Sequence, residues 1–163
     1  MAQSAVIVDF DPAWAEAFHR EAALIRAELG DLLQSIHHVG STAIPGMAAK
    51  PVIDICVESA HFPPSDAVIA GLSRLGYAHR GAGSVAGRHW FSKGDPRGFN
   101  LHWCPIGGTV AASQVLFRAK AIARPDLAAR YADAKRELSG RYDIDSLDYV
   151  LAKEPFIRAI LDG

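Results

Sequence analysis

Residues 37–57 read HHVGSTAIPGMAAKPVIDICV, and this stretch decides how the rest of the chain is interpreted. Gly40 permits a tight turn, and the hydroxyl and amide groups of Ser41 and Thr42 would favour an anion such as phosphate if a helix begins there. Asp54 lies farther along among aliphatic residues, where a carboxylate is costly unless it is paired, hydrogen-bonded or bound to a metal. The stretch therefore predicts a phosphate-binding turn beside an acidic group. The simpler alternative is a strand-to-helix turn and a structural carboxylate.

The composition is that of a globular protein with one domain. The chain has 163 residues, half of them hydrophobic, and a formal net charge of −1. Nothing in this charge indicates binding to nucleic acid or to a membrane surface. The two cysteines, Cys56 and Cys104, lie in apolar segments, which is typical of reduced intracellular thiols. Without an apolar run near the roughly 20 residues of a membrane span, or a visible signal peptide, we expect a cytoplasmic protein.

The N-terminal two thirds of the chain predict one long helix followed by a small mixed sheet. In residues 8–33, Trp14, Phe18, Ile25 and Leu29 recur at helical spacing, with Asp11 as the expected N-cap. The remaining predicted elements are strands at 35–39 and 50–57, a helix at 64–76 that begins after Ser65 and stops at Gly76, a strand at 77–80, and a hairpin over 88–105.

The remainder of the chain, from about residue 109, is helical in pattern. Residues 124–142 give the clearest helix, and residues 146–161 predict two short helices that meet near Pro155. Because the strands are confined to the centre, we predict an α+β fold in which helices flank a small mixed β-sheet and form the C-terminal third. We expect residues 1–163 to form a single domain.

Alternation along the predicted strands brings two polar groups together. Val52, Asp54 and Cys56 would share one face of their strand, and the residues between them would face the core. On the second hairpin strand, Asn100 and His102 share a face in the same way. If the two strands are neighbours, Asp54 and His102 lie close together on one face of the sheet, and we predict that both are catalytic. The alternatives are a structural carboxylate and a satisfied core histidine.

Basic residues near this region are candidates for phosphate contacts. Lys50 precedes the Asp54 strand, Arg88 begins the hairpin and could reach a triphosphate, and Lys93 ends the first hairpin strand. For Arg88 and Lys93, a solvated surface position is an equal alternative. The basic residues of the C-terminal helices are interleaved with acids, which predicts solvated faces, except that Lys153 is a candidate for the site. The set expected to be solvated comprises Arg118, Arg130, Lys135 and Arg136.

The quoted stretch resembles the signature of the GrpB family, whose proteins have a nucleotidyltransferase-like fold. The segments VDFDPAWAEAF, GRHWFSKGDPRGFNLHW, YADAKRELSGRY and AKEPFIRAIL extend the likeness over nearly the whole chain in the expected order. In active nucleotidyltransferases the Gly-Ser turn holds the triphosphate, and carboxylates hold two Mg²⁺ ions. The resemblance thus implies that Gly40, Ser41 and Thr42 bind nucleotide and that Asp54 binds a divalent metal, expected to be Mg²⁺.

The chain departs from that pattern at the metal site. Active relatives of the superfold carry a second acidic residue where this chain has Cys56, which is expected to be a small buried hydrophobe rather than a nucleophile. His102 is the nearest polar candidate for the place of a third carboxylate. His37 and His38 are further candidate ligands, although their side chains alternate in direction. A carboxylate with histidines suits a transition metal better than Mg²⁺, so either metal is possible.

Three interpretations of function follow. The first is an enzyme that binds a nucleoside triphosphate and a divalent metal and acts on an unknown small-molecule acceptor, with His102 as a ligand or general base. The second is a nucleotide-binding accessory or regulatory module without transfer activity, which the missing second carboxylate favours. The third is hydrolysis or condensation in a histidine-containing pocket of the same fold. Fold alone does not choose among them.

Overall fold

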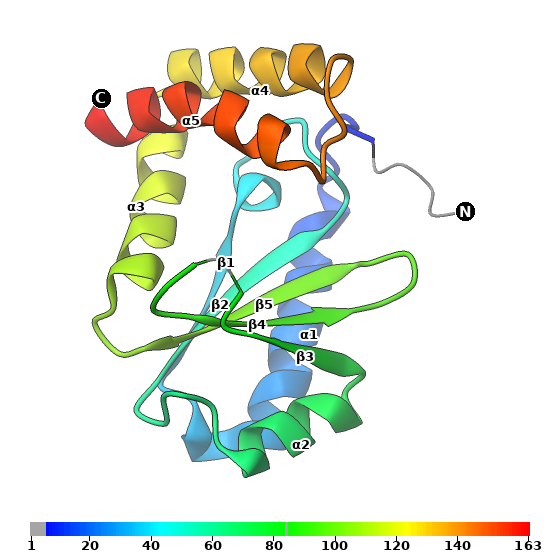
Figure 1. The fold of residues 1–163 in the computed structure, drawn as a ribbon, viewed down its shortest axis with the longest axis vertical. Coiled ribbons are helices and arrows are strands. Elements are labelled where there is room, and N and C mark those ends of the chain that lie inside the picture. Colours follow the sequence, from blue (N-terminus) through cyan, green and yellow to red (C-terminus); the bar gives the residue numbers. More distant parts are fainter. Residues whose placement is uncertain (1–5, 84) are drawn as a thin grey trace.

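The structure, a computed structural model, describes residues 6–83 and 85–163. Its centre is a five-stranded sheet in the order β1-β2-β5-β4-β3 (Figure 1). Only the central pair, β2 and β5, is parallel, and the other neighbours are antiparallel. The predicted α+β fold with a mixed sheet is therefore confirmed. The strands are β1 (Ser35–Val39), β2 (Ile53–Ser59), β3 (Tyr77–Gly81), β4 (His89–Lys93) and β5 (Phe99–Pro105).

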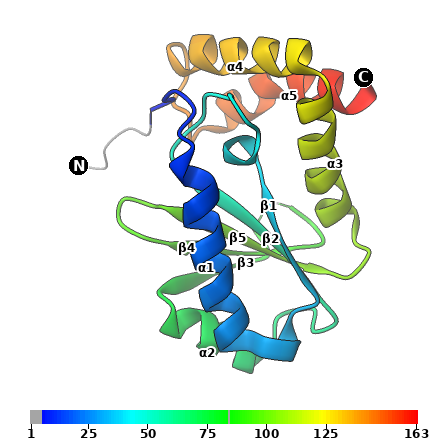
Figure 2. The same cartoon turned by 180° about the vertical axis from the view of Figure 1, so that it is seen from behind.

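Helices α1 (Ala13–Leu29) and α2 (Asp66–Arg74) cover one face of the sheet (Figure 2). The backbone amide of Ala13 donates to the Asp11 carboxylate at 2.9 Å, so the predicted capping residue stabilises the first turn of α1. Ser65 accepts from the Val68 amide at the start of α2 in the same manner. Ser65 is thus the cap of α2 as predicted, whereas Pro12, and not the predicted Asp11, occupies the N-cap position of α1. A short 3₁₀ turn, η1 (Gly30–Leu32), leads from α1 into β1.

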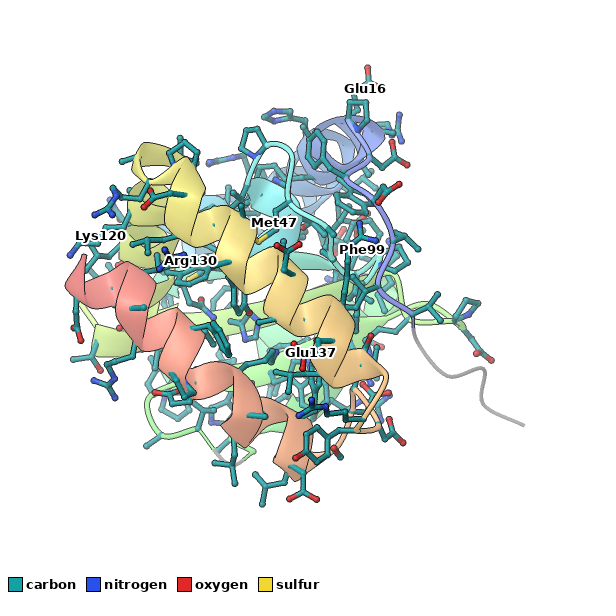
Figure 3. All side chains as sticks on the ribbon, turned by 90° about the horizontal axis from the view of Figure 1, so that it is seen from above. Glu16, Met47, Phe99, Lys120, Arg130 and Glu137 are labelled. Carbon is teal, nitrogen blue, oxygen red and sulfur yellow. The ribbon has the colours of Figure 1, made fainter. Side chains whose placement is uncertain are left out.

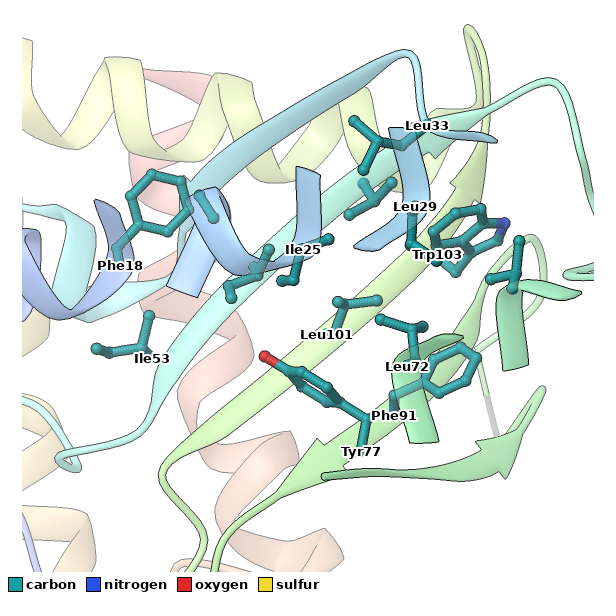
Figure 4. Packing of buried hydrophobic residues seen from close by; sticks show 14 of the residues in the cluster. Phe18, Ile25, Leu29, Leu33, Ile53, Leu72, Tyr77, Phe91, Leu101 and Trp103 are labelled. Atoms are coloured by element: carbon teal, nitrogen blue, oxygen red, sulfur yellow. The ribbon is translucent and has the colours of Figure 1, made fainter. Parts of the chain in front are cut away.

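The main core lies between these two helices and the sheet (Figure 4). On the α1 side, the core contains the residues that recur at helical spacing in the sequence, Trp14, Phe18, Ile25 and Leu29. On the sheet side, it contains alternate residues of β2 and β5. Ile55 and Leu101 are paired in register and fully buried, as is Trp103. This alternation fixes the register, because a slip by one residue would bury Asp54 and expose Ile55.

The C-terminal third consists of α3 (Thr109–Ala123), α4 (Pro125–Ser139) and α5 (Leu147–Asp162). α3 packs on the sheet face opposite α1, where Ala111 contacts a buried cluster that includes Val39 and Cys56. α4 and α5 lie side by side across the end of the sheet, with Met47 beneath α4 (Figure 3). No described helix is long and apolar enough to cross a membrane.

The prediction of two short helices around Pro155 was wrong. α5 continues through Pro155 as one helix. Proline removes one backbone hydrogen bond, but tertiary packing can override this loss. Tyr149 and Ile160, the buried residues of α5, lie on either side of the proline and hold both halves of the helix against its neighbours.

Candidate functional site

A pocket of about 260 Å³ opens where β1 and β2 meet the C-terminal helices. Its floor is the turn after β1, which forms the 3₁₀ turn η2 (Ser41–Ala43), together with Asp54 on β2. Its other side comes from α4 and α5. The predicted residues Gly40, Ser41, Thr42, Lys50 and Asp54 all line it. The sequence did not predict the remaining polar lining residues, apart from Lys153; they are Asn100, Tyr131, Lys135 and Tyr149.

Gly40 allows the turn to pass directly over Asp54. Its backbone has φ 75° and ψ −176°, a conformation found essentially only for glycine. A Cβ atom at this position would lie 2.5 Å from Asp54 Oδ2. The glycine therefore serves both the backbone conformation and the close approach of the turn to the carboxylate.

Asp54 is held by groups from the neighbouring strand β5. His102 Nε2 lies 3.3 Å from Asp54 Oδ1, so the predicted proximity of these two residues is confirmed. Asn100 pairs in register with Asp54, and its Oδ1 accepts from Trp90 Nε1 at 3.1 Å. Burial alone would raise the pKa of the Asp54 carboxyl, but His102, Asn100 and the charge of Lys50 together lower it. The group is therefore an ionised carboxylate facing the pocket.

Ser41 forms a buried polar contact with Lys135 of α4. Lys135 Nζ lies 2.8 Å from Ser41 Oγ and donates to the Ala48 carbonyl at 2.6 Å. The lysine is only 3% exposed, and its Nζ lies over the ring of Tyr131, 4.7 Å from the ring centroid. Burial, followed by the charges of neighbouring cations, lowers the pKa of Lys135 to about 7. Its ammonium and neutral amine forms are thus close in free energy near neutral pH.

Two further lysines face the same pocket. Lys153 Nζ lies 4.7 Å from the ring centroid of Tyr149, and burial together with the charge of Lys50 lowers the pKa of Lys153. Lys50 forms a weak, partly exposed contact with Asp145 at 3.4 Å. Within the described chain, neither Lys135 nor Lys153 has a carboxylate partner. Lys50 and Lys153, together with Lys135 in its ammonium form, therefore surround a single carboxylate among the described lining residues, which favours an anionic ligand.

Lys135 was predicted to lie on a solvated face, and this prediction was wrong. The acidic and basic neighbours of Lys135 do point outward, but the lysine itself is one helical turn from buried Tyr131. The sequence did indicate this burial, because Lys135 follows Tyr131 by four residues and so lies on the apolar stripe of an amphipathic helix. Lys153, by contrast, lines the pocket, in agreement with its prediction as a candidate for the site.

Two basic residues of the hairpin do not line the pocket. Lys93 donates to Glu21 of α1 at 2.7 Å, on the opposite face of the sheet from Asp54. The predicted phosphate contact was wrong because Lys93 pairs in register with Phe99, a residue that packs against the α1-side core. Arg88 directly precedes β4 and is absent from the pocket lining, and its Nη1 is buried without a partner among the described residues.

The four candidate metal ligands do not come together. His37 Nε2 lies 3.4 Å from Glu58, and His38 Nε2 lies 2.9 Å from Thr42 Oγ1. His38 also stacks on Phe18, and burial lowers its pKa to about 4. The alternation expected of adjacent β1 residues is present, but neither His37 nor His38 is placed as a ligand beside Asp54 and His102, because one contacts Glu58 and the other contacts Thr42 and Phe18. In residues 6–83 and 85–163, no three His, Cys, Asp or Glu side chains form a group that could hold a metal ion.

Cys56 is a core residue, as expected from its surroundings. It is fully buried, and its sulfur lies 4.0 Å from that of Cys104. The contact with Cys104, followed by burial, raises the pKa of the Cys56 thiol. Cys56 is therefore not poised to act as a nucleophile.

Comparison with known proteins identifies the family to which this chain belongs. The profile of the GrpB protein family matches residues 4–163. This chain belongs to the GrpB family. Its relatives include UPF0157 protein PA4798 of Pseudomonas aeruginosa, which is 35% identical and matches 95% of this chain, and UPF0157 protein YqkA of Bacillus subtilis, which is 31% identical and matches 93%. The matches span 65% and 45% of those two proteins, so the relatives are longer than the region they share with this chain.

Solved structures agree with this assignment. The GrpB protein of Enterococcus faecalis superposes with a TM-score of 0.86 over 96% of this chain and 95% of its own, at 29% identity. The Cid1 poly(U) polymerase matches with a TM-score of 0.52 and 14% identity, over 86% of this chain and 44% of the polymerase. The second likeness shows a nucleotidyltransferase-like fold and nothing further. The predicted family and fold are thus confirmed.

Proposed function

We propose that this GrpB-family chain binds a nucleoside triphosphate in the pocket beside Asp54 and acts as a nucleotidyltransferase-like enzyme on a small molecule. The observation that carries the proposal is the set of three lysines, Lys50, Lys135 and Lys153, around the Gly40–Ser41 turn. Two of them lack a carboxylate partner in the described chain, so a polyphosphate would supply the missing counter-charge. The turn amides would add hydrogen bonds to the phosphate oxygens.

The protein residues alone do not fit the two-ion site of active nucleotidyltransferases. Asp54 is the one carboxylate that lines the pocket among residues 6–83 and 85–163, and its Oδ1 is already close to His102. A single Mg²⁺ shared between Asp54 and the substrate phosphates is compatible with this arrangement, because Mg²⁺ sites often combine one carboxylate with phosphate oxygens. In this proposal the lysines supply most of the positive charge, and Asp54 orients the ligand or shares that ion.

Binding can be measured by calorimetry with ATP, the other nucleoside triphosphates and inorganic tripolyphosphate, each with and without Mg²⁺. We expect saturable binding that weakens by at least about tenfold in Lys135→Met and Lys153→Met, since each removes a charge-assisted contact. Arg130→Met is the matched control, because it removes an exposed cation from the same helix as Lys135. If wild-type protein binds none of these anions at millimolar concentration, the proposal is wrong.

The single carboxylate also supports a second candidate, a nucleotide-binding accessory module without transfer activity. Release of pyrophosphate from bound nucleotide in the presence of pooled metabolites separates the two candidates. Release that disappears in Asp54→Asn identifies an enzyme. Tight binding with no release under any acceptor identifies the module. Binding of metal alone at His102, lost in His102→Ala, would instead favour hydrolysis or condensation in a histidine-containing pocket.

A further inference from the structure

The contact between Ser41 and Lys135 has the geometry of a nucleophile and its base. The two atoms lie 2.8 Å apart, within the range for direct proton transfer. The Ala48 carbonyl can only accept, so it fixes one N–H bond of Lys135 and thereby orients the nitrogen toward Ser41. A nucleophile, a base and a third group that orients the base make up the general arrangement of covalent catalysis. Serine–lysine pairs are one of its known forms.

The surroundings favour the amine form that a base requires. Lys135 is buried, and the charged groups that face it are cations: Lys153 on α5, Lys50 before β2, and Arg136 on its own helix. Two further titratable neighbours, Tyr131 and Tyr149, have raised pKa values and stay neutral at physiological pH, mainly because they are buried. Asp54 is the anionic group among the described residues that line the same pocket. Ser41 itself lines the pocket and is half-buried, so a ligand can reach its oxygen.

We propose that Ser41 is a nucleophile activated by Lys135, and that this pair forms a covalent intermediate with a phosphorus electrophile bound in the lysine-lined pocket. The choice of a nucleotide as donor rests on the proposed function, whereas the reactivity of Ser41 does not. Such a route would compensate for the carboxylate that Cys56 replaces, because covalent catalysis divides one difficult transfer into two easier steps.

With a nucleoside triphosphate, the first step proceeds as follows. The neutral Lys135 amine takes the proton of the Ser41 hydroxyl while Oγ attacks the α-phosphorus. The Oγ–P bond forms, the bond from phosphorus to the bridging oxygen breaks, and pyrophosphate leaves as an anion beside Lys153. In the second step an acceptor hydroxyl attacks phosphorus and loses its proton to solvent. The P–Oγ bond then breaks, and Ser41 regains its proton from the Lys135 ammonium.

An alkyl fluorophosphonate tests the pair without requiring the natural donor. Attack by Ser41 forms an Oγ–P bond and expels fluoride, which leaves a stable adduct that mass spectrometry can locate. We expect one adduct, on Ser41, absent in Ser41→Ala and retained in Ser139→Ala. Lys135→Arg preserves the positive charge but cannot accept a proton, so the labelling rate should fall by about 100-fold or more. In wild-type protein the rate should rise through pH 7 and then level off.

Other results would overturn the proposal. An unlabelled Ser41, or a labelling rate that is the same in Lys135→Arg, means that the lysine only binds anions. If Lys135→Arg fails to fold, the wild-type pH profile decides, because a serine without a base would react faster with each increase in pH and show no plateau near neutrality. Excess ATP should protect Ser41 from the probe. If Ser41 is labelled at the normal rate and ATP does not protect it, the proposed nucleotide binding is wrong and the Ser41–Lys135 pair is retained. If the protein binds nucleotide but Ser41 is not labelled, the proposed pair is wrong and nucleotide binding is retained.

Discussion

Gly40 and Asp54 are packed so tightly that the carboxylate occupies the space a side chain on residue 40 would need, with Oδ2 2.5 Å from the position of its Cβ atom. Gly40→Ala should therefore displace either the turn or Asp54, in addition to about 1–3 kcal/mol of backbone strain. We expect reduced stability in urea denaturation and at least about tenfold weaker anion binding by calorimetry.

Gly46→Ala is the matched control for this change. Gly46 also has a positive φ of 79°, but nothing lies within 4 Å of the position of its Cβ atom. It should lose stability through strain and retain anion binding. Equal loss of binding in both variants would show that Gly40 acts through the backbone alone and that its approach to Asp54 is unimportant.

Lys135 should make the free energy of unfolding depend on pH in the range between about 7 and 10.5. Its pKa is about 7 in the folded protein and 10.5 when unperturbed, so the unfolded chain binds more protons between these values. The free energy of unfolding should consequently rise with pH over this window, by up to about 5 kcal/mol. Urea denaturation of wild type and Lys135→Met at pH 6.5 and pH 10 isolates this contribution. A wild-type-minus-variant difference that is constant with pH would contradict the lowered pKa.

Lys93 should matter for stability and not for the ligand. Removing its charge in Lys93→Met leaves Glu21, which is 5% exposed, with only the Tyr77 hydroxyl as a partner. Loss of one partner of a buried ion pair costs about 3 kcal/mol. The double variant Glu21→Gln with Lys93→Met should recover much of this loss, and nucleotide affinity should be unchanged in both. Weakened binding in a folded Lys93→Met protein would restore Lys93 as a phosphate contact.

His38 should contribute to unfolding in acid. Burial holds its pKa near 4, below the ordinary value of 6.5, so the folded state binds fewer protons in this window. Stability should fall by about 3 kcal/mol as the pH drops from 6.5 through 4. In His38→Gln, which can still hydrogen-bond to Thr42, denaturation between pH 4 and 7 should show a correspondingly weaker slope. The same slope in both proteins would indicate that other groups dominate.

Much of the fold could be predicted because local patterns and tertiary packing agree. The helical spacing in α1, the cap at Ser65 and the alternation along β2 and β5 each depend on neighbours a few residues apart. The helix break predicted at Pro155 was wrong because tertiary packing on both sides of the proline outweighs its local tendency to end a helix. Sequence spacing does not reveal this packing.

Most of the pocket lining on the sheet and the turn could be predicted, but most of the lining from the C-terminal helices could not. The proximity of Asp54 and His102 could be predicted because strand alternation fixes the direction of a side chain. Lys135 was missed because Ser41 is 94 residues away, and only the packing of α4 over the turn brings the two together. Charge interleaving described the outer face of that helix correctly, but it wrongly assigned the inward-pointing Lys135 to a solvated face.

Apart from Asn100, the polar lining of the pocket comes from two parts of the chain that are distant in sequence. The turn, Lys50 and Asp54 lie before residue 60, and the tyrosines and inward lysines lie after residue 130. A ligand bound between them would link the C-terminal helices to the sheet through contacts on both sides. Its effect on backbone amide hydrogen exchange should therefore extend along α4 and α5, well beyond the few side chains it contacts. Ligand binding would therefore hold α4 and α5 more firmly against the rest of the molecule.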